Sequence, residues 1–294
     1  MASSHKATGN FGSILDDSRL TISDGEFRQL RQFIHAHTGI ALSEHKKALV
    51  CSRLSKRLRH HGLQHYSDYY VLLVEQDPEG VELMAMINAI TTNKTDFFRE
   101  PHHFRFLAEQ LYPRVRTRRP ARLRLWSAGT ATGEEAYTLA INVRESFAAD
   151  PTADIRILAT DIDTNVLAHG ERGVYTADQA RHIPEALLHR YFWRGQGGNA
   201  GQVKAKPALA DLIRFRRLNL LDNPWPIHGP FDAILCRNVI IYFDRETQQQ
   251  LIARFARLLR PDGYLLLGHS ESVHDVGSGL RHVGQSVYQY LGAP

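Results

Sequence analysis

The sequence predicts an α/β protein built on a doubly wound, Rossmann-like sheet, with a helical N-terminal domain and a small antiparallel β insertion. An apolar run from Leu123 to Ala128 stops at a loop bracketed by Gly129 and Gly133, and this loop opens a helix. Two further apolar runs, Arg156 to Asp161 and Phe231 to Cys236, repeat the pattern at α/β spacing. We therefore expect parallel strands whose carboxyl ends meet at one edge of the sheet, where such folds bind ligands.

The start of the chain and its composition favour a soluble protein with two structural units. The Ser, Gly, His and Asn content of residues 1–20 predicts a disordered tail. The chain has 294 residues, of which 43% are hydrophobic, and no apolar run approaches the ~20 residues of a membrane span. The two cysteines, Cys51 and Cys236, are too few for a disulfide framework, so we expect reduced thiols and a cytoplasmic location.

Residues 21–90 are predicted to form the helical domain. Ser23 and Glu26 fit a capping box at the start of the first helix, and Gly39 is expected to end it. Ser43 is expected to cap the second helix, whose apolar residues recur at helical spacing. Two more helices are expected around Tyr66 to Glu75 and Glu79 to Ile90.

The second helix carries a basic outer face, with no acidic residue between His45 and His61. Such a face is either simply solvated or docks an anionic partner, and the net charge of +5 is compatible with an acidic protein or with RNA. RNA is disfavoured because the helix has no nearby stacking aromatic residues of a known RNA-binding module. The basic residues are Lys46, Lys47, Arg53, Lys56, Arg57 and Arg59.

Residues 91–121 are predicted to be a connector between the two units that contributes to the active site. The connector contains His102 and His103, but adjacent histidines do not share a helix face and make a poor metal site. No Cys and His cluster in the chain has zinc spacing, so we predict no metal.

The second domain is expected to span residues 122–294. The α/β pattern breaks between about residues 174 and 212, where a Gly-rich turn at residues 195–201 predicts the antiparallel insertion. Asp244 is expected to cap a later helix. The remaining strands are expected over Ile213 to Arg217, Tyr264 to Gly268 and Ser286 to Leu291.

The predicted crevice at the strand ends suits S-adenosylmethionine (SAM) better than a phosphate-bearing nucleotide. The glycine loop lacks the full Gly-x-Gly-x-x-Gly spacing and has no Gly-Lys-Ser/Thr sequence. Glu134 and Glu135 follow the loop at once, and their charges would repel a phosphate but suit a sulfonium and an ammonium group. Asp161 suits a ribose diol. On residue chemistry alone, other nucleosides stay open.

Five segments carry a resemblance to a known family, and they are Thr91 to Glu100, Trp126 to Glu135, Ala159 to Asp163, Cys236 to Phe243 and Leu259 to Ser272. Together they resemble the chemotaxis receptor methyltransferases usually called CheR, in the same order as in that family. The resemblance implies a SAM-dependent methyltransferase fold. It also implies transfer of the methyl group to glutamate side chains of chemotaxis receptors, which forms glutamyl methyl esters for sensory adaptation and leaves S-adenosylhomocysteine.

The resemblance and the residue chemistry together assign candidate roles. Arg99 is expected to hold the substrate carboxylate in a fork of N–H donors, and Tyr242 to present its hydroxyl beside the methyl group. The alternatives are an interdomain salt bridge for Arg99 and a core aromatic role for Tyr242. Glu135 would meet the methionine ammonium, and Asp161 would meet the ribose hydroxyls. Glu134 and Glu135 could exchange roles. The set expected to bind the cofactor is Asn93, Thr95, Arg99, Gly129, Glu135, Asp161, Asn219, Leu220, Arg237 and Asn238.

As partners, the resemblance implies acidic cytoplasmic methylation helices of chemoreceptors, docked on the basic helix face, and no nucleic acid. In some members of the family the β insertion binds a short C-terminal receptor peptide as an added strand, and the sequence leaves open whether this chain does. The protein is expected to be a monomer. Two alternatives stay open: a methyltransferase acting on RNA or a small molecule, and a binding module that senses SAM without turnover.

Overall fold

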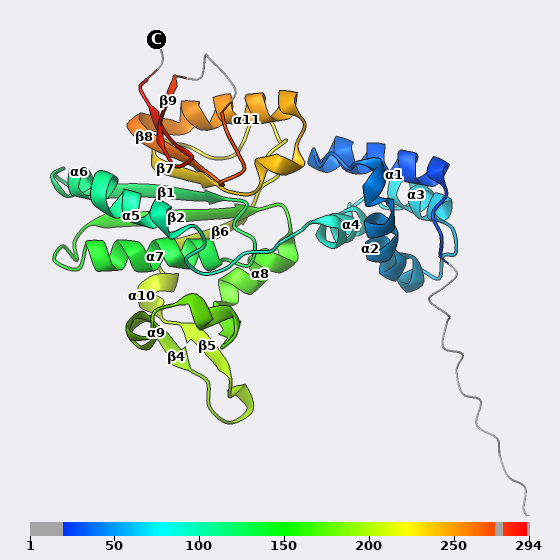
Figure 1. The fold of residues 1–294 in the computed structure, drawn as a ribbon. Coiled ribbons are helices and arrows are strands. Elements are labelled where there is room, and N and C mark those ends of the chain that lie inside the picture. Colours follow the sequence, from blue (N-terminus) through cyan, green and yellow to red (C-terminus); the bar gives the residue numbers. More distant parts are fainter. Residues whose placement is uncertain (1–19, 274–278, 293–294) are drawn as a thin grey trace, which may run out of the picture.

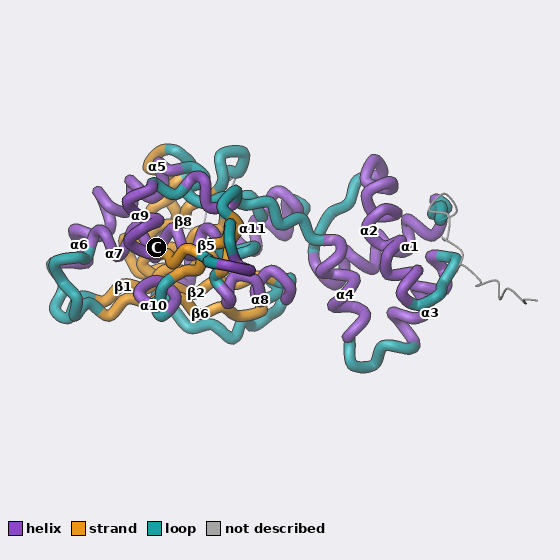
Figure 2. Tube along the Cα trace, turned by 90° about the horizontal axis from the view of Figure 1, so that it is seen from below, coloured by secondary structure: helices purple, strands orange, loops and turns teal. Residues whose placement is uncertain are grey.

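The computed structural model describes residues 20–273 and 279–292. The predicted tail at residues 1–20 lies outside the described residues, apart from Leu20. The helical domain and the α/β domain lie side by side and give an elongated molecule (Figure 1 and Figure 2). Among the described residues, no helix combines the length and apolar character needed to cross a bilayer.

The helical domain begins as the sequence predicts. The Ser23 hydroxyl accepts a hydrogen bond from the Glu26 N–H, and the Glu26 carboxylate accepts one from the Ser23 N–H, so the capping box is confirmed. Gly39 ends the first helix in the left-handed conformation, at φ 72°. In the described part of residues 20–90 the α-helices are α1 (Asp24–Thr38), α2 (Lys47–His60), α3 (Tyr66–Glu75) and α4 (Val81–Ile90).

One expectation about this domain is wrong. Ser43 makes no side-chain capping bond, and a short 3-10 turn, η2 (Glu44–Lys46), delays the start of α2 to Lys47. The reason is tertiary, because the loop before this turn is held by the α/β domain through a bond from the Ala41 N–H to the Tyr242 carbonyl oxygen. The apolar faces of the helices bury a core of their own, which includes Phe27, Leu30, Ile34, Val50, Leu54, Leu58, Tyr66 and Tyr69.

The predicted doubly wound sheet is confirmed, with seven described strands in the order β6-β2-β1-β7-β8-β10-β9. The strands from β6 to β8 pair in parallel, and β10 pairs antiparallel with both β8 and β9. Because the chain order reverses between β1 and β7, the fold has its ligand-binding switch point at the carboxyl ends of these two strands. The bounds are β1 (Arg122–Ala128), β2 (Asp154–Asp161), β6 (Ile213–Arg217), β7 (Phe231–Cys236), β8 (Leu259–Leu267), β9 (Leu280–Gly284) and β10 (Val287–Tyr290).

Helices cover both faces of the sheet (Figure 1). On one face lie α7 (Glu134–Ser146) and the helical run formed by α5 (Pro101–Phe106), the π-helical turn η3 (Leu107–Leu111) and α6 (Tyr112–Arg116), with α8 (Thr164–Arg172) near the β2 and β6 edge. The opposite face is covered by α11 (Arg245–Leu258), whose N-terminus is capped by Asp244 as predicted.

The predicted connector at residues 91–121 has two parts, and the second part packs into the α/β core. Phe104, Leu107 and Leu111 are buried against the same apolar cluster as the β1 residue Leu125. Their spacing of three and four residues gives one apolar helix face, and burying it favours helix over an open linker. Only the stretch before α5 crosses between the domains as extended chain.

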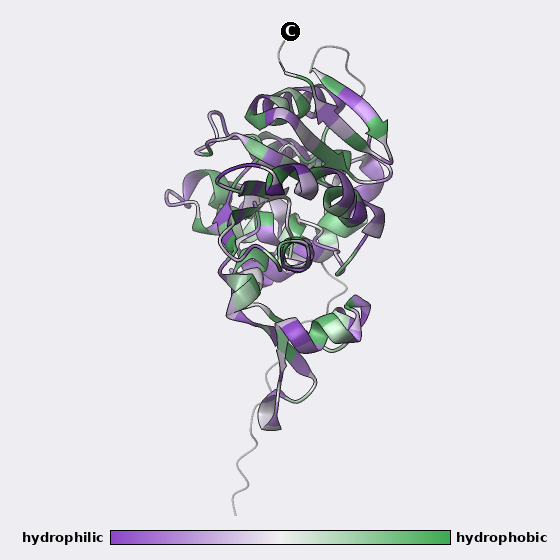
Figure 3. Cartoon of the chain, turned by 90° about the vertical axis from the view of Figure 1, so that its left-hand side faces the viewer, coloured by the Kyte–Doolittle hydropathy of each residue, from purple (hydrophilic) through white to green (hydrophobic). Residues whose placement is uncertain are grey.

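The predicted antiparallel insertion is confirmed as a three-stranded sheet in the order β3-β5-β4. It projects from the α/β domain, and hydrophobic residues, green in Figure 3, gather mainly within the body of that domain rather than at the tip of the insertion. The elements are β3 (Val174–Thr176), η4 (Gln179–His182), α9 (Glu185–Tyr191), β4 (Phe192–Arg194), η5 (Gly197–Asn199), β5 (Gln202–Ala205) and α10 (Pro207–Ala210).

Candidate active site

A pocket opens between the helical domain and the carboxyl ends of the central strands. The structure brings into its lining each residue that the sequence proposed for catalysis or cofactor binding, together with Lys46 of the basic helix face. Their roles stay predictions, but their convergence is a property of the fold. These residues are Asn93, Thr95, Arg99, Gly129, Glu135, Asp161, Asn219, Leu220, Arg237, Asn238 and Tyr242.

The glycine loop after β1 forms the floor of this pocket. Gly129 has φ 79°, and a Cβ atom placed on it would lie 2.3 Å from the Cγ2 atom of Val239. The N–H groups of Gly129 and Thr130 both donate to the Thr160 carbonyl oxygen, at 2.8 and 2.9 Å. A side chain at position 129 is therefore excluded by space as well as by conformation.

Asp161 ends β2 with its carboxylate nearly buried beside the loop. Its Oδ2 atom accepts from the Ala131 N–H at 2.9 Å, and its Oδ1 atom accepts from the Asp163 N–H at 3.0 Å. None of the described residues gives it an ion pair, and burial raises the pKa of Asp161 to about 6. The group is an unpaired buried acceptor at the pocket wall.

Glu135, Arg237 and Glu100 form a buried ionic chain behind the pocket. Arg237 Nη1 lies 2.9 Å from Glu135 Oε2, and Arg237 Nη2 lies 3.2 Å from Glu100 Oε2. Glu135 Oε1 also accepts from the Ser127 hydroxyl at 2.7 Å. Two carboxylates thus share one guanidinium, which leaves the cluster with a net negative charge when both are ionised. Burial raises the pKa of Glu135, and Arg237 opposes that rise.

The structure distinguishes the adjacent residues Glu134 and Glu135, whose roles the sequence left interchangeable. Glu135 lines the pocket, whereas Glu134 is buried away from it and accepts from the Thr132 hydroxyl at 2.6 Å. Only Glu135 is therefore placed to meet a ligand.

Arg99 lies on the strained stretch that enters α5, between Phe98 and Glu100, which both have φ 55°. Its carbonyl oxygen accepts from Arg237, and its guanidinium donates to the Lys94 carbonyl oxygen at 3.1 Å. Within residues 20–273 and 279–292 no carboxylate pairs with Arg99. The interdomain salt bridge is therefore not what holds this side chain, and its charge remains available to an anionic substrate.

Tyr242 reaches the pocket on a tight turn after β7. Asn238 takes a left-handed conformation at φ 59°, and the 3-10 turn η6 (Ile240–Tyr242) follows it. The Tyr242 carbonyl oxygen accepts from the Ala41 N–H at 2.7 Å, which joins the turn to the helical domain.

Asp163 is a site-forming residue that sequence reasoning missed. Its Oδ1 atom caps α8 by accepting from the N–H groups of Asn165 and Val166. Its Oδ2 atom accepts from the Thr91 hydroxyl and from the Asn93 amide, each at 2.7 Å. An acid before a helix is an N-cap signal, but the sequence carried no sign of the second contact.

Asn219 lines the pocket, and its side chain is also bonded within the protein. Its amide donates to the His37 carbonyl oxygen at 2.7 Å and its Oδ1 atom accepts from the Leu221 N–H at 3.0 Å. The side chain therefore ties the α/β domain to the end of α1. The sequence also gave no signal for the pocket residues supplied by the end of α1 and the loop after it, which are Thr38, Ile40, Ala41, Leu42 and Ser43.

Two of the six residues on the basic face of α2, Arg53 and Arg57, bond to other groups of the protein. Arg57 donates from Nε to Glu82 at 2.9 Å, because the Glu82 carboxylate is buried and requires a cation. Arg53 donates to the Thr91 carbonyl oxygen at 2.9 Å, just beyond the end of α4. Both side chains hold the helical domain together rather than forming part of an open face.

The other members of that face remain accessible to differing degrees. Lys47 pairs with Asp24 at 2.6 Å. Lys46, Lys56 and Arg59 are exposed. The basic surface is therefore smaller than the sequence indicates, and Lys46 links it to the pocket.

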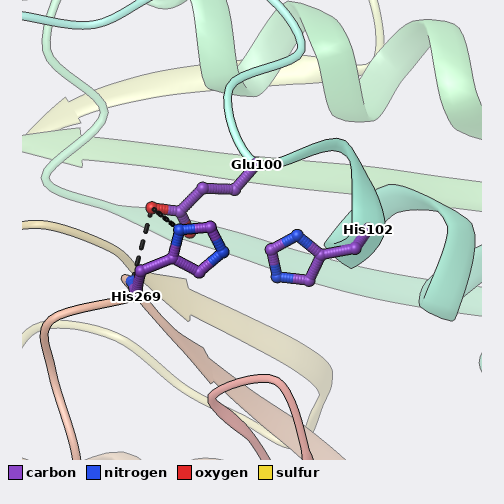
Figure 4. A group of neighbouring side chains, drawn as sticks. All are labelled: Glu100, His102 and His269. Carbon is purple, nitrogen blue, oxygen red and sulfur yellow. Dashed lines mark hydrogen bonds and ion pairs between the residues drawn. The ribbon is translucent and has the colours of Figure 1, made fainter.

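Tertiary structure places His269 beside the connector histidine His102, as Figure 4 shows. Ligand atoms of Glu100, His102 and His269 lie within 4.8 Å of one another. The two rings are stacked with their centroids 4.7 Å apart and their planes 6° from parallel, so their in-plane nitrogen lone pairs do not converge on one point. Glu100 also forms an ion pair with Arg237, and we propose no metal site here.

The polar groups of the pocket fit SAM. The net negative charge shared by Glu135, Glu100 and Arg237 suits a cationic methionine end, and the unpaired Asp161 carboxylate suits hydroxyl donors. Apolar side chains that suit a base line the rest, and they include Leu42, Leu49, Ile162, Leu218 and Leu220. The doubly wound sheet and this pocket define the class of protein, a SAM-dependent methyltransferase.

Comparison with known proteins gives the family. A model described as the CheR methyltransferase SAM binding domain matches residues 93–289, and one described as the CheR methyltransferase all-alpha domain matches residues 25–91. The chain belongs to the CheR methyltransferase family.

Curated relatives agree over nearly the whole chain. A chemotaxis protein methyltransferase of Klebsiella aerogenes is 43% identical over 92% of this chain and 91% of the relative. One from Escherichia coli is 42% identical over 92% of both chains, and chemotaxis protein methyltransferase 2 of Pseudomonas aeruginosa is 44% identical over 90% of this chain and 92% of its own. Among solved structures, the DszA carbon methyltransferase covers 85% of this chain and 53% of its own, with 16% identity and a TM-score of 0.38.

Proposed function

We propose that this enzyme transfers the methyl group of SAM to glutamate side-chain carboxylates of chemotaxis receptors, giving glutamyl methyl esters and S-adenosylhomocysteine. The observation that carries the proposal is the convergence of Arg99 and Tyr242 with the carboxylates of Glu135 and Asp161 in one pocket. The names of the relatives support a chemotaxis substrate, and they do not favour RNA, a small molecule or a sensor without turnover.

The proposed cofactor contacts follow the charges of the pocket. Glu135 meets the methionine ammonium, with Arg237 and Asn238 along the same end, and Asp161 accepts from the ribose hydroxyls. Asn93, Thr95 and Gly129 close around the ligand. The adenine lies against Leu220 and the backbone at Asn219, because the Asn219 amide is already bonded to the helical domain.

The proposed reaction requires alignment rather than proton transfer. Bound SAM supplies an electrophilic methyl group on a sulfonium. A substrate Glu with a pKa near ~4.3 is already ionised at pH 7, so no base is required. One carbon–oxygen bond forms as one carbon–sulfur bond breaks, and no proton moves. Arg99 holds the carboxylate and Tyr242 borders the methyl group, a positioning effect that can contribute several kcal/mol.

Receptor docking is proposed on the exposed part of the basic face. Lys46, Lys56 and Arg59 would attract an acidic methylation helix toward the pocket that Lys46 lines. Reversing charge at Lys46 and Lys56 should slow methylation most at low salt, and added salt should reduce the difference between variant and wild type.

A second contact with receptors is proposed at the edge of the three-stranded sheet. Strand β4 has one neighbour, β5, and exposes the Trp193 side chain, so an extended C-terminal peptide can add there as a strand. In this proposal residues 21–90 dock the receptor, residues 91–121 contribute to the active site, and residues 122–294 bind SAM. The protein works as a monomer in the cytoplasm beside membrane-embedded receptors.

A single experiment tests the proposed function. The protein is incubated with methyl-labelled SAM and membranes that hold chemoreceptors, and mild base is then used to release label as methanol. Base-labile receptor label is expected. Receptors that stay unlabelled although the protein binds SAM would contradict the assignment and favour another substrate.

A further inference from the structure

We infer that Glu271 is a positioning residue for methyl transfer, whose carboxylate fixes the turn that carries Asn238 and Tyr242. Glu271 lies outside the pocket lining, and its importance is visible only through its contacts. The inference rests on the proposed function, because Tyr242 is the group through which Glu271 would act.

The carboxylate of Glu271 gathers N–H groups from the ends of two neighbouring strands. Its Oε2 atom accepts from the N–H of Asn238 at 2.7 Å, after β7, and from that of Gly268 at 2.6 Å, after β8. Its Oε1 atom accepts from the N–H of Ile241 at 3.3 Å. The residue is 5% exposed, so water does not replace these bonds.

The turn carries a backbone conformation that needs support, and the Glu271 carboxylate accepts from the N–H groups of Asn238 and Ile241 within it. Asn238 is a non-glycine residue at φ 59°, a conformation that requires support from its surroundings. A Cβ atom on Gly268 would lie 2.5 Å from the Asn238 Nδ2 atom, so the Asn238 side chain is also held closely. The two strand ends and the carboxylate therefore form one tightly fitted unit.

A negative charge suits this place. Among the described residues no cation forms an ion pair with Glu271, and bonds from N–H groups to a carboxylate are roughly twice as strong as neutral ones. Burial raises the pKa of Glu271, and the N–H groups of Asn238, Gly268 and Ile241 oppose that rise. A glutamine keeps the size but turns an NH2 group toward N–H donors, which removes at least one bond.

The loss of the Glu271 bonds would reach the pocket through the backbone of the turn. Val239 follows Asn238 directly, and its carbonyl oxygen accepts from the Tyr242 N–H at 3.2 Å. This bond closes the turn η6, which spans Ile240–Tyr242. If the turn relaxes, the Tyr242 side chain loses its fixed place beside the pocket. A misplacement near 1 Å can lower the rate of an aligned reaction by roughly 10²-fold.

The test compares Glu271→Gln with the wild type, with Tyr242→Phe and with the double variant. We expect Glu271→Gln to lower kcat for receptor methylation by roughly 10- to 100-fold. The KM for SAM should rise by a smaller factor, because Asn238 on the same turn also belongs to the proposed cofactor site. In the Tyr242→Phe background the same substitution should have a much smaller effect, because residues that act through one another are not additive. The exposed Glu246→Gln serves as the matched control and should leave the rate unchanged.

Hydrogen exchange supplies a second readout that needs no receptor. In Glu271→Gln the amides of Asn238 and Ile241 should exchange faster, while those of the core strand β1 keep their protection. Amide exchange at the turn that is as slow in the variant as in the wild type would overturn the inference. A double variant whose loss of kcat equals the product of the two single losses would overturn it as well. Wild-type protein that binds SAM but methylates no receptor would contradict the proposed function instead, and the exchange result would still decide the role of Glu271.

Discussion

The N–H of Ala41 donates a 2.7 Å hydrogen bond to the carbonyl oxygen of Tyr242 and so joins the helical domain to the turn after β7 that lines the pocket. Ala41 lies in the loop after α1, and the same loop lines the pocket with Ile40 and Leu42. The pocket is therefore built from both domains, and the helical domain supplies part of its lining.

Substituting proline for Ala41 removes the N–H and should separate the two domains at this point. We expect Ala41→Pro to lower the kcat of receptor methylation roughly tenfold, since the loss of one bond worth about 1 kcal/mol loosens Tyr242. The control Ala41→Ser keeps the N–H on an exposed position and should retain wild-type kcat. Equal rates for the proline and serine variants would show that the bond does not contribute.

Removing the Arg99 guanidinium should impair catalysis far more than folding. Arg99→Ala is expected to lower kcat/KM for receptor roughly 10²-fold while SAM affinity, measured by calorimetry, changes much less. Arg99→Lys should recover only part of the rate because it cannot form the two-pronged contact. The exposed Arg105 on α5 offers a matched control, and an equal loss in Arg105→Ala would argue against a specific role.

SAM binding should strengthen as the pH rises through about 6. The pKa of Asp161 is about 6 in the folded chain against an ordinary 3.8, so the carboxylate gains its charge in this range, where it best serves hydroxyl donors and a cationic ligand. Calorimetry from pH 5 to pH 8 measures the effect, and Asp161→Asn should remove the part due to this residue. A variant with the wild-type pH dependence would contradict the prediction.

The raised pKa of Asp161 also affects the stability of the ligand-free protein. Between pH 3.8 and about 6 the folded chain holds a proton that the unfolded chain has released. The contribution of Asp161 therefore makes the free energy of unfolding fall as the pH rises through this window.

Arg57 is expected to matter for stability rather than for receptor docking. Arg57→Ala leaves the buried Glu82 carboxylate without its guanidinium, and the free energy of unfolding should drop by about 2 kcal/mol. Chemical denaturation followed by circular dichroism measures this loss. The neighbouring exposed Lys56→Ala should change it by less than about 0.5 kcal/mol. A similar small change for both variants would show that the ion pair is not structural.

Local sequence patterns predicted the elements well because short-range physics decides them. The capping box at Ser23, the αL glycine at Gly39 and the bounds of β6 all follow from residues near in the chain. The prediction failed where distant contacts intervene. Ser43 does not cap α2, because the preceding loop is held by the other domain.

The sequence by itself determined the fold class and part of the pocket, because strand ends and motif spacing bring Gly129, Asp161 and Asn238 to one edge of a parallel sheet. Only the tertiary structure decided which charges are free to act. Arg57 pairs with the buried Glu82, and Arg237 pairs with both Glu135 and Glu100. Asp161 has no ion pair within the described part of the chain. The physical reason is that a buried charge must find a partner or shift its pKa, and the partner can come from any part of the chain.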